Sequence, residues 1–307
     1  MEAALTAVRA LHFGAGVVLF GQFAFAAFVS PGGRLPPRFA ATAWTSLALS
    51  AVTACAWLAI EGVNMSGLPA AEALRGPTLE TVLFRTQFGH VWIARAFLMA
   101  LLCLALATAG GTAGERRRGT FVALGGIVSV ALLASLACAG HAAADTGAGR
   151  YAHGAADALH LVAAGAWLGA LVPFTALLAG AARDASPEAL GRARSATHRF
   201  SILGVASVGT LAATGIVNTC YMIPDVGAFF HSRYGLELAA KLCLVALVVA
   251  LAADNRLRLT ARLDAGAPQA ARALFRNACL EVLLGFAIVA IVANLGITVP
   301  PMAMAAR

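Results

Sequence analysis

The stretch GTFVALGGIVSVALLASLACAG, residues 119–140, contains 22 residues and no charged side chain. A helix rising 1.5 Å per residue needs about 20 apolar residues to cross roughly 30 Å of hydrocarbon. The stretch also lacks the alternation of polar and apolar residues that a membrane β-strand shows. It therefore predicts a transmembrane helix, and the same test can be applied along the whole chain.

Seven further runs of this kind occur among the 307 residues, of which only 12% are charged, about half the share in a soluble domain. The predicted helices cover about 5–30, 39–60, 88–109, 119–140, 153–180, 198–221, 234–254 and 275–299. We expect an all-α, polytopic membrane protein that forms one eight-helix transmembrane domain over residues 1–307. The first run lacks a basic start and is too long for a signal peptide, so we expect it to be retained.

Basic residues are distributed unevenly between the two sides of this predicted bundle. The connections after the first, third, fifth and seventh helices carry 14 of the 22 Lys and Arg, and the opposite side carries six. Because cytoplasmic connections are enriched in Lys and Arg, these four connections are predicted to be cytoplasmic and both termini periplasmic. The same bias accounts for the net charge of +8 without a nucleic-acid partner.

The seven histidines are biased toward the outer side. By this topology, six lie in or beside the outer half of the bundle and only His198 lies on the other side. Imidazole is the commonest side-chain metal ligand, and a polar residue at membrane depth indicates a functional site. The six outer histidines are His12, His90, His141, His153, His160 and His231.

Three polar residues of the fifth predicted helix share one face. His153, Asp157 and His160 stand at i, i+4 and i+7, which is the spacing of a helical stripe. An Asp between two His fits an orienting carboxylate or a third ligand. We expect the stripe to face the bundle interior, because a charged residue in lipid costs about 2.5–3.5 kcal/mol on insertion scales.

Sulfur-containing side chains occur at the same outer level. Imidazole, thiolate and thioether together favour copper, Cu(I) in particular, over Mg²⁺ or Ca²⁺. None of the six cysteines forms a CxxC pair, which excludes a zinc knuckle. The predicted copper ligands are His141, His160, His12, His90, His153, Cys138 and Met222, and the residues leave Cu(I) and Cu(II) both open.

Further charged residues are predicted inside the membrane. Glu237 and Lys241 stand at i, i+4, the favourable order for an ion pair, and we expect them to neutralise each other or to bind other partners. Arg95 is expected to pair with Glu61 or Asp157. With Asp157, Glu237 and Lys241 are the predicted supporting residues of the site.

Four sequence segments, taken in order, resemble one known family. They are Gly140-His141; DALHLVAAGAWLG at 157–169; Arg199-Phe200-Ser201 followed by Thr214-Gly215 and Asn218; and Tyr234-Gly235 followed by Lys241-Leu242 and Asn255-Arg256. In this order they resemble the copper resistance protein D family. The chain departs from the family at Leu236 and Glu237, because members often carry a basic residue soon after the Tyr-Gly.

The resemblance implies copper movement across the bacterial inner membrane, usually as uptake from the periplasm, and no enzymatic activity. It matches His141, Asp157, His160, Trp167 and Lys241 to family motif positions. It also implies a separate periplasmic copper-binding partner of the copper resistance protein C type. The chain could in addition form a homo-oligomer.

Two other functions are compatible with the same residues. A b-type haem oxidoreductase would use paired histidines on facing helices, such as His12 and His160. A copper receptor would bind the metal without transporting it. The sequence carries no GxxxxGK[ST] motif for ATP, so transport is expected to be driven by gradients or by delivery and removal of metal.

Overall fold

The computed structural model describes residues 1–30, 35, 38–108, 115–140 and 149–305. Within these residues the chain is helical without strands, and eight helices are long and apolar enough to cross a membrane. The long helices are α1 Glu2–Ala24, α2 Phe39–Ser66, α5 Gln87–Thr108, α6 Glu115–Ala134, α7 Arg150–Ala164 with α8 Ala170–Asp184, α9 Pro187–Met222, α11 Arg233–Asp254 and α13 Pro268–Leu295.

Short elements continue or connect these helices. Three of them are π-helical segments that lengthen or join long helices: η1 Phe25–Val29, η5 Gly165–Gly169 and η6 Asn255–Leu259. The others are the 3-10 turn η3 Ser135–Ala139 and the short helices α3 Ala70–Ala73, α4 Gly76–Arg85, α10 Val226–His231, α12 Thr260–Asp264 and α14 Pro301–Ala305. Insertions of the π type are frequent at functional sites.

Two helices begin seven or more residues earlier than predicted. Helix α9 begins at Pro187 instead of 198, and α13 begins at Pro268 instead of 275. The hydroxyl of Ser186 accepts a hydrogen bond from the backbone N–H of Ala189, and Pro at the first helical position needs no donor. These extensions carry polar residues, so a search for apolar runs does not find them, although the Ser186 cap of α9 and the first-turn proline of both helices are visible in the sequence.

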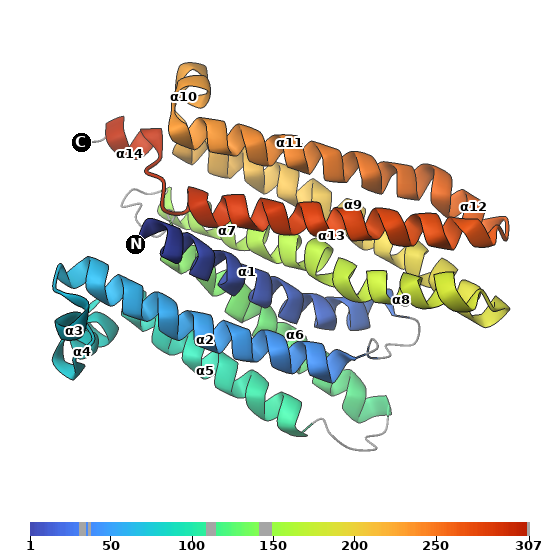
Figure 1. Ribbon diagram of the computed structural model, residues 1–307, viewed down its shortest axis with the longest axis horizontal. Helices are drawn as coiled ribbons and strands as arrows, with labels where there is room; N and C mark the ends of the chain where they lie inside the picture. The colour runs from blue at the N-terminus through green and yellow to red at the C-terminus, as the bar shows by residue number, and fades with distance from the viewer. Residues whose placement is uncertain (31–34, 36–37, 109–114, 141–148, 306–307) are drawn as a thin grey trace.

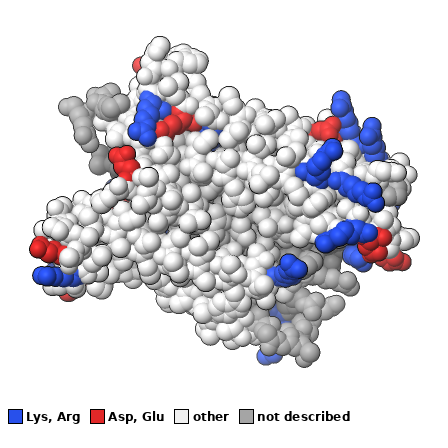
Figure 2. Space-filling view, in the orientation of Figure 1, with Lys and Arg blue, Asp and Glu red and all other residues white. Residues whose placement is uncertain are grey.

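The long helices run side by side along one axis (Figure 1). Helix α1 begins and α14 lies at one end of the bundle, called here the terminal end. Lys and Arg gather at the opposite end, the arginine-rich end, and the surface between the two ends is almost free of charge (Figure 2). This belt exposes large apolar side chains such as Phe97, Leu104, Ile127 and Ile202, as expected for a surface that meets lipid.

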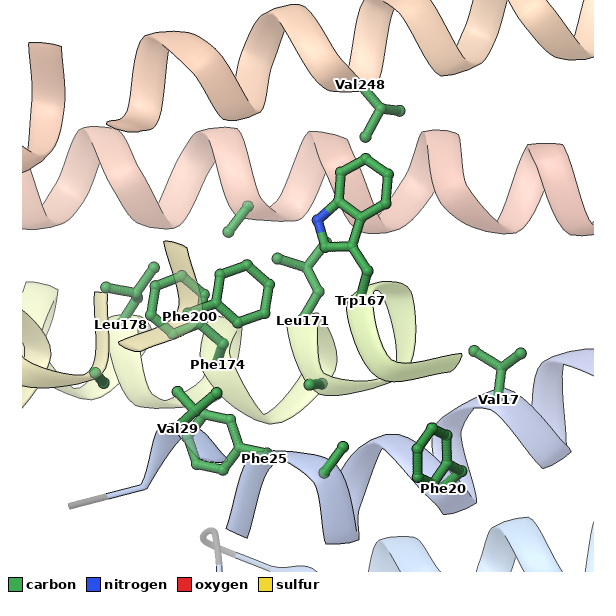
Figure 3. Packing of buried hydrophobic residues seen from close by; sticks show 14 of the residues in the cluster. Val17, Phe20, Phe25, Val29, Trp167, Leu171, Phe174, Leu178, Phe200 and Val248 are labelled. Carbon is green, nitrogen blue, oxygen red and sulfur yellow. The ribbon is translucent and has the colours of Figure 1, made fainter. Parts of the chain in front are cut away.

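Helix α1 is the centre of the bundle. It is the most buried of the eight spans, and it packs against α2, α6, η5, α8 and α13. Figure 3 shows Phe25 of η1 on the side of Phe174 of α8, and Trp167 of η5 directed toward Val248 of α11. Phe174 in turn stacks on Phe200 of α9, with ring centroids 4.4 Å apart. Lipid supplies little hydrophobic driving force between helices, so close packing of this kind holds the bundle together.

The closest approach in this core joins α1 to η5. Gly21 and Gly169 face each other so closely that a Cβ on either would overlap the backbone of the other helix. Small residues at helix interfaces in membranes allow such backbone contact. The position therefore fixes the distance between the first and fifth spans.

We predict that Gly169→Ala lowers the free energy of unfolding by about 3 kcal/mol, because the methyl group must push two packed backbones apart. The matched control is Gly180→Ala on α8, where a Cβ meets nothing within 4 Å. Thermal unfolding of both variants in detergent measures the difference. Equal stability of the two variants would contradict the packing at Gly169.

Candidate functional site

One group of polar side chains, the α1 cluster, surrounds His12 on the central helix. The imidazole is 1% exposed, its Nδ1 lies 2.8 Å from Thr53 Oγ1 of α2, and its Nε2 is hydrogen-bonded to the guanidinium of Arg95 on α5. Thr53 gives its own proton to the carbonyl of Leu49, 2.6 Å away. Thr53 therefore accepts from Nδ1–H and Nε2 accepts from Arg95, so neither ring nitrogen is free for a ligand.

Arg95 fixes this arrangement. It is buried and donates at 2.6 Å both to the carbonyl of Leu132 and to Ser135 Oγ. The predicted pairing with Glu61 or Asp157 is wrong, because the guanidinium points toward α1 and η3 and forms no ion pair with any described carboxylate. Depth along a helix was predictable, whereas the direction of the side chain was not.

Arg9 is a second buried arginine, which the charge count assigned to the outer side. Its Nε donates to the carbonyl of Ala293 at 3.2 Å, and its guanidinium lies 4.5 Å from the ring centroid of Trp57. Glu61 interacts with it electrostatically. Arg9 and His12 are three residues apart on α1 and therefore lie on one face of that helix, a spacing that is visible in the sequence.

A second group, the α7 cluster, consists of Asp157, His160, Thr214, Asn218 and Lys241 from helices α7, α9 and α11. Thr214 donates its hydroxyl proton to the carbonyl of Thr210 at 2.7 Å. Its Oγ1 also lies 2.9 Å from His160 Nδ1 and must accept there. This contact places a proton on His160 Nδ1, and Nε2 has no hydrogen-bond partner among the described residues. The lone pair on Nε2 is available to a metal ion.

Asp157 and Asn218 lie one turn from His160. Asn218 Nδ2 donates to Asp157 Oδ1 at 3.5 Å, while the buried Asn218 Oδ1 has no partner in the part of the chain that the structure describes. A Cβ on Gly140 would lie 3.8 Å from Asp157 Oδ2, so the chain passes this carboxylate immediately before His141. His141 itself lies outside the described residues.

The predicted stripe on α7 faces α9. His153 is buried and stacks on Tyr221, with ring centroids 4.6 Å apart and planes 2° from parallel. One turn further along α7, Asp157 is hydrogen-bonded to Asn218, and the next turn places His160 in a hydrogen bond with Thr214. The three stripe residues therefore contact successive turns of an antiparallel neighbour, which agrees with an interior-facing stripe.

The ion pair considered between Glu237 and Lys241 does not occur in the structure. Glu237 instead accepts from Arg233 at 3.0 Å, from Asn294 at 2.8 Å and from Thr298 at 3.0 Å. Lys241, one turn further along α11, interacts electrostatically with Asp157. The two side chains interact with different neighbours, Glu237 with α13 and Lys241 with Asp157 of α7, so each has a partner other than the ion pair between them.

The remaining predicted ligands differ in burial and in their distance from the α7 cluster along the helices. Met222 is buried one turn beyond Asn218, in an apolar group with Tyr234 and Leu238. His90 is exposed and hydrogen-bonded to the carbonyl of Phe84 at 3.1 Å, and Cys138 is exposed on η3. No group of three or more His, Cys, Asp or Glu is arranged to hold a metal within the described residues.

The surroundings of His12 and His160 argue against a haem bound between these two histidines. A haem held between His12 and His160 needs a free nitrogen on both rings, and both nitrogens of His12 are occupied. His160 is the one imidazole of this pair that presents a lone pair. The geometry therefore favours a site on the α7 cluster alone.

Comparison with known proteins agrees with the sequence segments. Residues 1–152 match the family model described as copper resistance protein D-like, N-terminal domain, and residues 194–295 match copper resistance protein D. Copper resistance protein D of Pseudomonas syringae pv. tomato is 32% identical over 299 residues, which cover 94% of this chain and 92% of that protein. No solved structure matches the chain.

Two further relatives differ in how much they share. The inner membrane protein YebZ of Escherichia coli is 27% identical over 96% of this chain and 97% of its own length. The copper transport protein CutJ of Bacillus subtilis is 29% identical over 182 residues, which is 57% of this chain and 31% of that protein.

We predict that His12→Leu lowers the free energy of unfolding by about 3 kcal/mol, because Arg95 loses a buried acceptor. His90→Leu, at an exposed histidine, should leave stability within about 0.5 kcal/mol. Chemical unfolding in detergent compares the two variants. Copper bound per folded His12→Leu molecule should equal that of the native protein, and a loss of copper without a loss of stability would make His12 a ligand.

Proposed function

The chain belongs to the copper resistance protein D family, and from this premise we propose that it carries copper across the bacterial inner membrane, from the periplasm to the cytoplasm. It is a multi-pass membrane protein of eight apolar spans. The observation that carries the proposal is His160, whose Nε2 has no hydrogen-bond partner among the described residues while Nδ1 is held by Thr214.

The hydrogen bond from His160 to Thr214 prepares the imidazole for copper. A metal-binding histidine usually donates its second N–H to a fixed acceptor, which sets the tautomer and the ring orientation. Thr214 provides that acceptor because its own proton is held by the carbonyl of Thr210. Copper then binds at Nε2 without a proton having to leave the ring.

Further ligands would come from the terminal end. His153 and Met222 lie on neighbouring turns of α7 and α9, and His141 follows Gly140, which borders Asp157. Cys138 lies on the same connection as Gly140. Imidazole and thioether donors of this kind suit Cu(I). With the arginine-rich end in the cytoplasm, the ligands face the periplasm, where a partner of the copper resistance protein C type would deliver the metal.

Lys241 gives the empty site its charge balance. It interacts electrostatically with both Asp157 and His160, and in the proposed mechanism its ammonium balances the carboxylate when copper is absent. A copper ion at His160 competes with this ammonium for Asp157, because like charges repel in a medium of low dielectric constant. We infer that Lys241 keeps binding reversible, as transport requires.

We predict that His160→Ala removes the tightest copper site and reduces copper uptake at least tenfold, because the prepared ligand is lost. His198→Ala is the control at an exposed histidine of the arginine-rich end and should behave as the native protein. Metal analysis of purified protein and uptake into liposomes measure the two effects separately. Copper binding without uptake by the native protein would identify a receptor, and unchanged uptake by His160→Ala would refute the proposed site.

We also predict that Thr214→Val weakens copper binding about 10–100-fold, since loss of an outer-shell acceptor has that effect on metal sites. The control is Thr210→Val, because the Thr210 hydroxyl donates only to the carbonyl of Ala206 on an exposed face. Competition with a copper chelator gives both affinities. Equal affinities would show that the orientation of His160 does not depend on Thr214.

A further inference from the structure

Glu281 is a buried carboxyl group that the proposed copper site does not use. It lies midway along α13, within the membrane span Gln269–Leu295, and is 2% exposed. Burying an ionised carboxylate without a counter-charge costs several kcal/mol or more, so buried carboxylates are paired or protonated. The partners of Glu281 decide which of these applies.

The hydrogen-bond partners of Glu281 are uncharged. Asn255 Nδ2 donates to Glu281 Oε1 at 2.5 Å, and Asn277 Nδ2 donates to Asn255 Oδ1 at 2.9 Å. Asn255 begins the π-helical segment η6, and its carbonyl accepts from Thr260 Oγ1 at 2.7 Å. The π segment turns the Asn255 side chain into the bundle, where its amide binds the carboxyl group but cannot neutralise it.

Three arginines on the elements around α13 bond groups other than Glu281. Arg9 bonds the carbonyl of Ala293, Arg183 that of Ala179, and Arg256 bonds Ser201. Among the described residues, Glu281 takes part in no ion pair. The other charged or titratable groups on the packed elements and on α13 include His12, Asp184, Arg194, His198, Lys241, Asp254, Arg258, Arg262, Asp264, Arg272, Arg276 and Cys279.

A cleft at the arginine-rich end is bordered by Asn277, one helical turn from this carboxyl group. It has a volume of about 520 Å³ and is lined by Asn277 together with Arg258, Arg262 and Arg276. Asn277 and Glu281 stand at i, i+4 on one face of α13, about 6 Å apart along the helix axis. The two asparagines therefore connect the wall of an open, basic cleft to the buried carboxyl group.

We propose that Glu281 is a proton-binding site that exchanges its proton with water in this cleft. In the empty protein the carboxyl group is neutral, with the proton on one carboxyl oxygen. When a cation enters the arginine-rich half, the O–H bond breaks, the proton leaves through the cleft, and the carboxylate balances the passing charge. The proton returns after the cation has left. The second step rests on the proposed copper transport, whereas proton binding by itself does not.

Infrared spectroscopy of the protein in lipid bilayers, without copper, tests proton binding. The native protein should show a protonated-carboxyl C=O band that declines as the pH is raised. Glu281→Gln should lose this band, while Glu281→Asp should retain it. The control Glu237→Gln should also retain it, because Glu237 is paired with Arg233. The same band in Glu281→Gln, or no such band in the native protein, would overturn the proposal.

Copper uptake into liposomes with the arginine-rich end facing inward tests the second step. Lower internal pH should slow uptake by the native protein, because protonated Glu281 cannot balance the cation. Glu281→Gln should bind copper at the native stoichiometry and lose this dependence on internal pH. The amide oxygen can still accept from Asn255, so the variant should fold, which thermal unfolding checks. Native pH dependence in Glu281→Gln would refute the coupling, whereas failure of all uptake would refute the proposed function and leave the infrared result standing.

Discussion

The structure depends on one constraint: a polar side chain inside a membrane bundle must find its partners within the chain, since lipid offers none. The central helix shows how this is met. Arg9 and His12 lie on α1, and their partners come from the neighbouring helices α2, α5 and α13. Each of these bonds ties the central helix to another span. The close contact of Gly21 with Gly169 then sets the spacing at which such bonds can form.

His12 and His160 share the same hydrogen-bonding pattern at Nδ1 but differ at Nε2. In both cases a threonine gives its proton to a carbonyl one turn earlier and accepts from histidine Nδ1–H. The difference lies at the opposite nitrogen, because His12 Nε2 accepts from Arg95 while His160 Nε2 remains open. A sequence shows two histidines at membrane depth. The position of the arginine separates the structural imidazole of His12 from the proposed ligand His160.

The features that could be predicted are those that depend on one helix alone, such as its apolar length and the spacing of its polar residues. Apolar length predicted eight spans, and the spacing of His153, Asp157 and His160 predicted one interior stripe. Partners across helices were harder to predict, as Arg95 and Glu237 show, because they depend on how each helix is rotated and which helices are neighbours. Glu281 was overlooked for a related reason. One carboxylate in an apolar run gives no pattern until Asn255 and Asn277 are brought beside it.

Taken together, the half-buried Asp157 and the buried Glu281 suggest how a cation could pass through an apolar bundle. A permanent negative charge would bind the cation too tightly for release, and an interior without any charge would exclude the cation. Asp157 has a positive partner in Lys241, which copper at His160 would displace electrostatically. Glu281 has only amide partners, so the positive charge that neutralises it must be a proton. In the proposed mechanism each carboxyl group therefore exchanges one positive partner for another, and the low-dielectric interior never contains an unbalanced charge for long.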